Sequence, residues 1–487
     1  MNHASGLAAG LQHDWQNSAK TITFCKWKDV IGGVTEMELT ALLKQRGEQA
    51  RLFPVLADNS REGRAASIFL ACVQTVPSFA DAILSPLGRG IGTRSKITCL
   101  TEVLFKSHPD KRPDGIITVQ TGSSTWSALL EFKVGGKLEV GQVEDYLKIA
   151  NQNSLDALIT ISNDLVSYPT VCPVKIDGRL TRSIKLFHLS WMHIFTQAEL
   201  LLSEDRFQTR DHRYLISEFA RFLVHKSTGI RGFEAMPEAW QDIVRCIRSR
   251  ASLSKRDEKV IDVVDGWLQE ERELELVLSR KTSTRCRVKR PRGADKSLDM
   301  LRSRHINQLV KAGQLTTAIE IPNAVSPIDV CADIASRSIL FSMTARAPGD
   351  RKRATASINW LLRQLPSDLS IDPFLRVHWP GRTKSTQKPL SEARREPEIL
   401  LPGAKVGIPV RFEIVMLHEL KSKFESRKGF IRALEDGIRE FYEAIGQHLP
   451  SWTPPPPKGR ETSAVEEIVE KASFDDERPD AFNPFLE

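Results

Sequence analysis

The order of apolar and polar residues between positions 62 and 162 predicts an α/β unit. Ala65, Phe69, Cys72 and Val76 recur at spacings of four, three and four, which is the pattern of a helix with one apolar face. Short apolar runs bounded by turn residues then predict strands. The expected order is a helix over residues 62–76, strands over 97–105, 115–120 and 126–134, a helix over 141–150 and a strand over 155–162.

The flanking regions are expected to be helical in part and to include a second α/β unit. Residues 37–49 have a helical pattern, residues 184–195 predict a strand, and residues 197–280 are mainly helical. In the C-terminal half the expected elements are strands over 338–344, 375–379 and 410–417 and helices over 352–365 and 430–445. Four consecutive prolines at residues 454–457 predict an extended spacer before a disordered acidic tail.

Composition narrows the class of protein. With 41% hydrophobic and 27% charged residues among 487, the chain fits a globular protein and neither a disordered nor a collagen-like one. The sequence has no apolar run near the ~20 residues that cross a bilayer, and its start lacks the pattern of a secretory signal. We therefore expect a cytoplasmic protein without membrane contact. The seven cysteines are scattered, without metal-binding spacing, and are expected to be reduced thiols.

The charge pattern favours a polyanionic partner such as nucleic acid. The net charge is +8, although residues 461–487 hold nine acids against two bases, so the remainder of the chain is strongly basic. The glycine-rich segment 88–92 and its neighbours could approach phosphates, or could be a flexible connector. Residues 280–296 could be a nucleic-acid-contacting arm, or a solvated linker. The candidate contact residues are Arg89, Arg94, Lys96, Arg285, Arg287, Lys289, Arg290 and Arg292.

Two neighbouring predicted strands carry a set of charged residues that suggests metal-dependent hydrolysis. Asp114 opens one apolar strand, and Glu131 and Lys133 lie in the next one. Because strand side chains alternate between faces, Glu131 and Lys133 point the same way, and a hairpin would bring Asp114 to them. Two carboxylates can hold Mg²⁺, and the lysine can orient the attacking water. The alternative is an exposed cross-strand ion pair between Glu131 and Lys133, with Tyr146 in the core.

This arrangement resembles the PD-(D/E)XK nuclease superfamily, which has a restriction-endonuclease-like core of helix, three strands, helix and strand. The motif stands here as Pro113-Asp114 followed by Glu131-x-Lys133, and the resemblance covers roughly residues 62–162. Gln142 and Tyr146, one helical turn apart, are similar to the Gln-x-x-x-Tyr element of RecB-like members. We expect an α/β fold of this class, with a helical appendage and a second α/β C-terminal domain.

The resemblance implies roles for individual residues. Asp114 and Glu131 would be ligands of Mg²⁺ or Mn²⁺, and the backbone carbonyl of Phe132 would add a third. Lys133 would position the nucleophilic water, and Gln142 and Tyr146 would support the substrate or the geometry of the site. An acid on the first helix often assists the metal in this family. Two residues remain candidates for that role: Glu62, seven residues before Phe69 on the apolar stripe, and Glu102, which shares a predicted strand face with Leu100 and Leu104.

The expected function is that of a Mg²⁺-dependent deoxyribonuclease. By fold-level analogy it would serve a prokaryotic restriction-like or antiviral defence system, with the C-terminal domain or the acidic tail docking a protein partner. The alternative is a catalytically silent subunit that binds nucleic acid. DNA or RNA preference and oligomeric state stay open. The expected domains are a nuclease domain at 1–196, a helical region at 197–280, a basic linker at 281–297, an α/β domain at 298–452 and a tail at 453–487.

Overall fold

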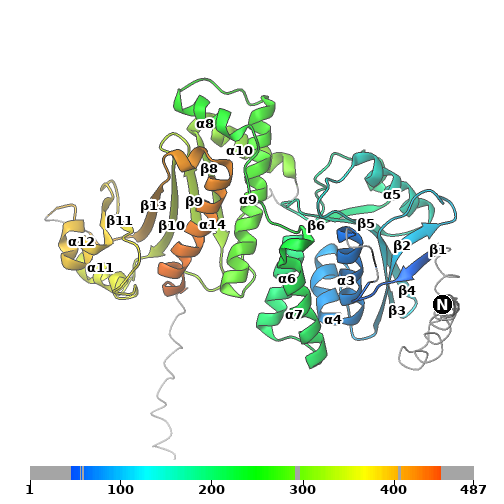
Figure 1. Ribbon diagram of the computed structural model, residues 1–487. Coiled ribbons are helices and arrows are strands. Elements are labelled where there is room, and N and C mark those ends of the chain that lie inside the picture. The colour runs from blue at the N-terminus through cyan, green and yellow to red at the C-terminus, as the bar shows by residue number, and fades with distance from the viewer. Residues whose placement is uncertain (1–44, 55, 57–59, 291–296, 404–406, 451–487) are drawn as a thin grey trace, which may run out of the picture. The chain divides into compact units, whose positions relative to one another are not determined.

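The computed structural model describes residues 45–54, 56, 60–290, 297–403 and 407–450. The chain is mixed α/β, with a six-stranded mixed sheet in its N-terminal part and a seven-stranded antiparallel sheet in its C-terminal part (Figure 1). The predicted Pro-rich spacer and acidic tail lie outside the described residues. The predicted helix over 37–49 is wrong where it can be compared, because Gln45–Gln49 form strand β1.

The six-stranded sheet follows the chain order, β1-β2-β3-β4-β5-β6. Strands β1 to β4 pair antiparallel, whereas β4, β5 and β6 pair parallel. Antiparallel neighbours can be joined by tight turns, and the parallel pair β4–β5 needs the crossover helix α5, Val140–Gln152. The remaining strands are β2 (Ser95–Phe105), β3 (Gly115–Thr121), β4 (Ser124–Phe132), β5 (Ala157–Ser162) and β6 (Lys185–Ser190).

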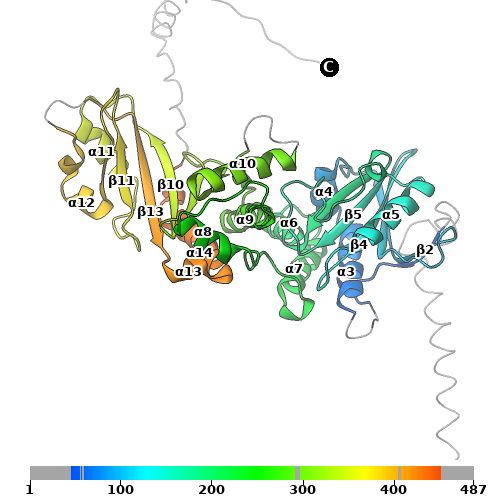
Figure 2. The same cartoon turned by 90° about the horizontal axis from the view of Figure 1, so that it is seen from above.

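Helices cover both faces of this sheet (Figures 1 and 2). Helices α3 (Arg61–Thr75), α4 (Pro77–Leu84), α6 (Trp191–Glu204) and α7 (Arg210–Val224) share one apolar core with one face, and α5 packs on the other. The predicted order of helix, three strands, helix and strand is present as α3, β2, β3, β4, α5 and β5, with α4 inserted after α3. Sheet residues alternate between the two cores, as Ile116 and Ile117 do.

The predicted strand over 184–195 is only half correct. Strand β6 ends at Ser190, and helix α6 begins at Trp191. The Ser190 hydroxyl accepts a hydrogen bond of 3.0 Å from the backbone N–H of His193, so Ser190 is the N-cap of α6. The proposed domain boundary between residues 196 and 197 therefore falls inside a continuous helix.

The C-terminal sheet has the order β12-β11-β13-β10-β9-β8-β7. Helices α9 (Glu258–Thr282), α10 (Leu298–Ala312) and α14 (Arg427–Ala444) pack against it, and α8 (Trp240–Arg248) packs on α9. Shorter helices are α11 (Ala354–Leu362), α12 (Leu390–Arg395) and α13 (Ser422–Glu425). The strands are β7 (Arg287–Val288), β8 (Gln314–Glu320), β9 (Ile328–Asp333), β10 (Ser338–Arg346), β11 (Phe374–His378), β12 (Thr386–Pro389) and β13 (Arg411–Glu419).

The predicted basic linker is part of the fold over most of its length. Residues 281–282 end α9, and β7 pairs antiparallel with β8 at the edge of the C-terminal sheet. Arg290 is almost fully buried and forms an ion pair with the buried carboxylate of Glu271, 2.6 Å between Nη1 and Oε2. Charge density alone predicted solvation, but this buried cation has a specific acceptor. Residues 291–296, including Arg292, lie outside the described residues.

Length and hydropathy decide whether a helix can cross a membrane. In the described part of the chain, no helix alone is long and apolar enough to do so. The segments Arg61–Thr75 and Pro77–Leu87 meet the length and composition requirement only when they are taken together, with a bend of 110° between them. Most apolar residues of both segments are buried in the core of the six-stranded sheet.

Candidate active site

Asp114 is placed by the backbone at the start of β3. Gly115 pairs with Leu130, so Asp114 and Glu131 come next to each other at the same end of the β3–β4 pair. A Cβ at position 115 would lie 2.6 Å from Leu70 Cδ1 on α3 and 3.2 Å from the carbonyl oxygen of Leu100, so a side chain at this position would force its neighbours to shift. The Pro-Asp-Gly sequence thus ends the connection from β2 to β3 and places the carboxylate of Asp114 beside helix α3.

Asp114, Glu131 and Lys133 meet as the strand alternation predicted. The Asp114 Oδ2 accepts a hydrogen bond of 2.8 Å from the backbone N–H of Phe132. Glu131 is fully buried, and its Oε1 lies 2.7 Å from Lys133 Nζ. The ring of Phe132 points to the opposite face, where it packs on Phe69 and Trp191. The exposed cross-strand ion pair that was the alternative interpretation is wrong, because Glu131 has no solvent exposure.

Glu62 joins this group, and Glu102 does not. Glu62 lies in the first turn of α3; its Oε1 accepts from the backbone N–H of Val134 at 3.0 Å, and its Oε2 lies 3.7 Å from Lys133 Nζ. Glu102 has a left-handed φ of 51° and forms an ion pair with Arg112 at 3.3 Å. The left-handed Glu102 forms a β-bulge in β2, and the bulge shifts the alternation of side chains along this strand by one residue. The sequence interpretation, which put Glu102 on one regular strand face with Leu100 and Leu104, is therefore wrong.

Gln142 and Tyr146 lie on α5 at the edge of the site. The Gln142 amide lies 3.3 Å from the Tyr146 hydroxyl, which donates to the backbone carbonyl of Arg112 at 3.2 Å. Tyr146 is mostly buried, and burial raises its pKa to about 12, with the negative charges of Glu131 and Asp114 acting in the same direction. The pair thus braces the Arg112–Asp114 segment from the α5 side of the sheet.

The electrostatics of the site raise the pKa values of both carboxyl groups in the absence of a cation. Burial, followed by the negative charge of Asp114, raises the pKa of Glu131 to about 8. Burial also raises the pKa of Asp114. Burial disfavours the charged form of Lys133, but the contact with Glu131 outweighs this effect of burial, so the pKa of Lys133 is raised. One buried and one partly buried carboxyl group with raised pKa values beside one ammonium are typical of a functional site, since they destabilise the free fold.

This arrangement predicts a pH dependence of stability that Glu131→Gln removes. The folded protein holds a proton on Glu131 up to pH of about 8, while a free glutamate loses it near 4.5. Between these values the folded state binds more protons, so the free energy of unfolding falls as the pH rises. In EDTA, Glu131→Gln should match the wild type near pH 5 and be more stable near pH 9. Within that interval the difference in the free energy of unfolding between the variant and the wild type should grow by about 1.4 kcal/mol per pH unit.

Urea unfolding measured from pH 5 to 9 tests this expectation. Glu139→Gln is the matched control, because Glu139 is an exposed glutamate at the start of α5 and should leave the wild-type profile unchanged. A Glu131→Gln profile parallel to that of the wild type would show that Glu131 is ionised in the folded protein at neutral pH.

The residues present fit a hard divalent cation. Among the described residues, no group of three or more His, Cys, Asp or Glu side chains is placed to hold a metal ion. Mg²⁺, however, usually takes one or two protein carboxylates and completes its shell with water and substrate phosphate. Both carboxylate oxygens of Glu131 are buried without a hydrogen-bond partner, although Lys133 lies within ion-pair distance. Together with Asp114 they provide the oxygen ligands that such an ion requires.

Helix α6 supports the site, which sequence reasoning missed. The indole N–H of Trp191 donates to the backbone carbonyl of Lys133 at 3.0 Å, and its ring stacks on Phe132 at 5.7 Å between centroids. The signal was present in Ser190, an N-cap residue placed directly before Trp191. The neighbouring His188 is buried and bonded to Thr160 and to the carbonyl of Asp164, as expected of a satisfied core histidine.

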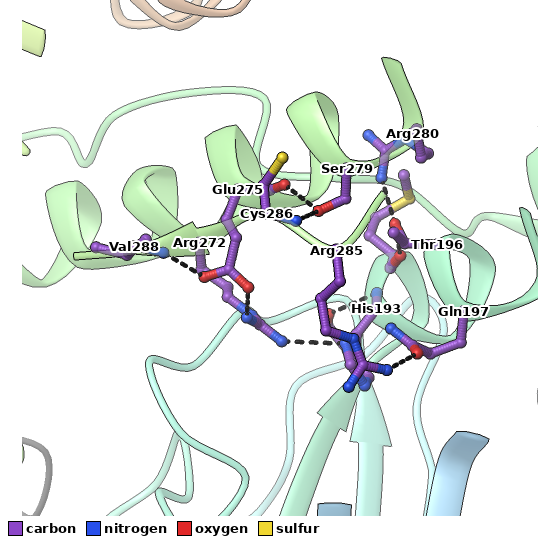
Figure 3. Close-up of polar contacts among 12 residues, drawn as sticks. His193, Thr196, Gln197, Arg272, Glu275, Ser279, Arg280, Arg285, Cys286 and Val288 are labelled. Atoms are coloured by element: carbon purple, nitrogen blue, oxygen red, sulfur yellow. Dashed lines mark hydrogen bonds and ion pairs between the residues drawn. The ribbon is translucent and has the colours of Figure 1, made fainter. Parts of the chain in front are cut away.

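Helix α6 also contacts helix α9 and the segment after it (Figure 3). His193 lies 3.0 Å from Arg272, Thr196 accepts from Arg280 at 2.7 Å, and Gln197 accepts from Arg285 at 2.6 Å. Arg272 also pairs with Glu275, which accepts from the backbone N–H of Val288. Arg280 and Arg285 are thus bonded to protein acceptors, and the same helix that touches Lys133 contacts α9.

Arg89, Arg94 and Lys96, which were predicted to bind nucleic acid, lie away from the candidate site. Arg89 donates to the Val119 carbonyl and to Thr121, at the far end of β3 from Asp114. Lys96 is exposed and pairs in register with Gln120 at this same end, and Arg94 is exposed nearby. About six residues of β3 separate this end from Asp114, and six residues of a strand span roughly 20 Å. Arg89 therefore fastens the 88–92 loop to the sheet, which the alternatives of phosphate loop or flexible connector did not anticipate.

A comparison of the sequence with protein-family models found no match, and neither did a comparison with curated proteins. The function must therefore be argued from the geometry of the site.

Proposed function

We propose that this protein is a Mg²⁺-dependent deoxyribonuclease of the PD-(D/E)XK type. The observation that carries the proposal is the convergence of Asp114, Glu131 and Lys133 at one end of β3 and β4, with both oxygens of Glu131 buried and Oε1 lying 2.7 Å from Lys133 Nζ. The order α3, β2, β3, β4, α5, β5 supports the proposal, because it is the order of elements that the sequence resemblance implies. Mn²⁺ would serve the same ligands.

Each residue has a role that follows from its position. Asp114 and Glu131 would hold the ion, together with the backbone carbonyl of Phe132, and the ion when bound would supply positive charge at the scissile phosphate and a more acidic water. The Lys133 ammonium, fixed by Glu131 at 2.7 Å, would orient the attacking water. Glu62 holds the backbone N–H of Val134, which positions the segment after Lys133. Gln142 and Tyr146 brace the backbone before Asp114.

A cleavage assay tests the proposal directly. Purified protein is incubated with supercoiled plasmid in Mg²⁺, in Mn²⁺ and in EDTA, and in parallel with linear duplex DNA, single-stranded DNA and RNA. We expect nicking or linearisation of the plasmid that needs the divalent ion. Binding of DNA without cleavage in any metal would instead identify a catalytically silent nucleic-acid-binding subunit. The restriction-like or antiviral role stays a prediction.

A pair of matched variants separates the two candidates for the additional acid. Glu62→Gln weakens the anchor of Val134 and removes a negative charge 3.7 Å from Lys133 Nζ, so we expect cleavage to fall roughly 10- to 100-fold, the range typical of residues that orient metal ligands. Glu102→Gln breaks only an exposed ion pair and should cleave like the wild type. The readout is the cleavage rate as a function of Mg²⁺ concentration. Equal losses in both variants would contradict the assignment of Glu62.

A further inference from the structure

A cavity lies in the C-terminal part of the chain, on one face of the seven-stranded sheet. Phe341 and Met343 on β10 face the apolar core, where Phe341 stacks on Phe441 of α14. Because side chains alternate, Leu340 and Ser342 face the other way. On that opposite face a cavity of about 520 Å³ is present, and β8, β9, β10, β11 and β13 contribute to its floor. Cavities of this size fit small-molecule ligands.

The wall of this cavity carries two cationic side chains that form no ion pair with the described residues. Lys289, just after β7, and Arg304, on α10, both line the cavity and are exposed. Neither forms an ion pair with another residue in the described part of the chain, in contrast to Arg290 and Arg376, which are paired with Glu271 and Glu413. Two cations next to a cavity are therefore available to an anionic ligand.

A buried histidine of the wall has an unused hydrogen-bonding atom. His305 on α10 lines the cavity and is 2% exposed. Its Nε2 lies 3.3 Å from Glu271, which also pairs with Arg290, while its Nδ1 has no partner among the described residues. A buried polar atom without a partner destabilises a fold, so its presence at a cavity points to a ligand that satisfies it.

The floor of the cavity adds groups that suit the rest of a polar ligand. Ser342 offers a hydroxyl, and Asp329 a carboxyl group that makes no ion pair with a described residue. Burial raises the pKa of Asp329, and the positive charge of Lys289 opposes this effect, so the two groups are neighbours. A carboxyl group on the floor would repel the phosphates of a continuous duplex, whereas it can accept a hydrogen bond from a hydroxyl or amino group of a small molecule.

We propose that this cavity binds a small phosphate-bearing ligand of nucleotide size. Lys289 and Arg304 contact the phosphate, and His305, Ser342 and Asp329 contact the polar groups of the remainder. Charge-assisted contacts to phosphate from Lys and Arg are strong, and the mixed floor provides selectivity. The proposal does not depend on the proposed nuclease function, because none of these residues lies in the candidate active site.

The test uses the full-length chain in EDTA, with inorganic pyrophosphate, AMP and ATP as probes and adenosine as the uncharged control. Isothermal titration calorimetry and thermal unfolding report binding. We expect AMP or ATP to bind and to raise Tm, and adenosine to bind at least tenfold more weakly, as loss of one charge-assisted contact predicts. Arg304→Gln and Lys289→Gln should each weaken nucleotide binding by about tenfold or more. Both side chains are exposed, so both variants should fold.

Arg432→Gln is the matched control, since Arg432 is an exposed arginine on α14, which packs on the opposite face of the sheet. This variant should bind the probes like the wild type. The proposal is overturned if neither nucleotide binds at millimolar concentration, if pyrophosphate alone binds, or if Arg304→Gln and Lys289→Gln bind as tightly as the wild type. Duplex DNA binding that Arg304→Gln abolishes, without nucleotide binding, would assign this face to nucleic acid instead.

Discussion

Asp114→Asn and Lys133→Gln are each expected to lower Mg²⁺-dependent cleavage of plasmid by on the order of 1000-fold, the scale seen when a group that stabilises transition-state charge is removed. The first substitution keeps the shape of the aspartate side chain but removes the negative charge that would hold the cation. The second removes the ammonium that Glu131 fixes at 2.7 Å. The measurement is the initial rate of supercoiled plasmid loss at saturating Mg²⁺.

The chain offers a close control for each variant. Asp110→Asn changes the exposed aspartate of Pro109-Asp110, which has the same local sequence as Pro113-Asp114 four residues later. Lys137→Gln changes an exposed lysine shortly after β4. Both controls should cleave like the wild type. Because the pKa of Asp114 is raised by burial, Asp114→Asn should not destabilise the metal-free fold. Wild-type cleavage by Asp114→Asn would remove the catalytic assignment.

Arg290→Ala is expected to destabilise the protein by about 3–5 kcal/mol, the typical result of removing one partner from a buried ion pair. Arg290 and Glu271 are both at least nine-tenths buried. Burial opposes the charge of Glu271, but contacts from His305 and Arg290 outweigh it and lower its pKa. Without Arg290, that carboxylate keeps only His305. The measurement is the free energy of unfolding from urea titration at pH 7.

Arg287→Ala is the control from the same basic segment. Arg287 is exposed on the edge strand β7, so its removal should change the free energy of unfolding by less than about 0.5 kcal/mol. If Arg290 were part of a solvated arm, Arg290→Ala would be as stable as Arg287→Ala and would lose only affinity for nucleic acid. The comparison therefore separates a structural role of this segment from a binding role.

Local sequence was sufficient for most elements around the candidate site. The stripe of Ala65, Phe69, Cys72 and Val76 predicted α3, because its period matches one face of a helix. Alternation within residues 126–134 placed Glu131 and Lys133 together and Phe132 on the other face, and the structure confirms this. The C-terminal helix over 430–445 is present as α14. In each case one face of the element is buried, and apolar residues therefore recur in the sequence at the period of that element.

Three features could not be obtained in this way. The bulge in β2 changes the face on which the Glu102 side chain lies. A single left-handed residue does not show in the spacing of the apolar residues, so the sequence could not reveal it. Trp191 was assigned to a strand because a short apolar run fits a buried strand and a buried helix equally well. Arg280, Arg285 and Arg290 looked solvated in the sequence, because their acceptors lie on other elements or far back along α9: Thr196 and Gln197 on α6, and Glu271 on α9.

The sequence by itself determined the main helices and strands around the candidate active site and its three charged residues, because apolar periods and strand alternation depend on neighbours within a few positions. It gave no prediction for α10, β8 and β9. Only the tertiary structure placed Glu62 and not Glu102 beside the candidate site, brought Trp191 to the carbonyl of Lys133, and paired Arg290 with Glu271. Those contacts join residues that are 19 to 72 positions apart. The burial that makes them strong arises when separate elements pack together, so no local pattern records it.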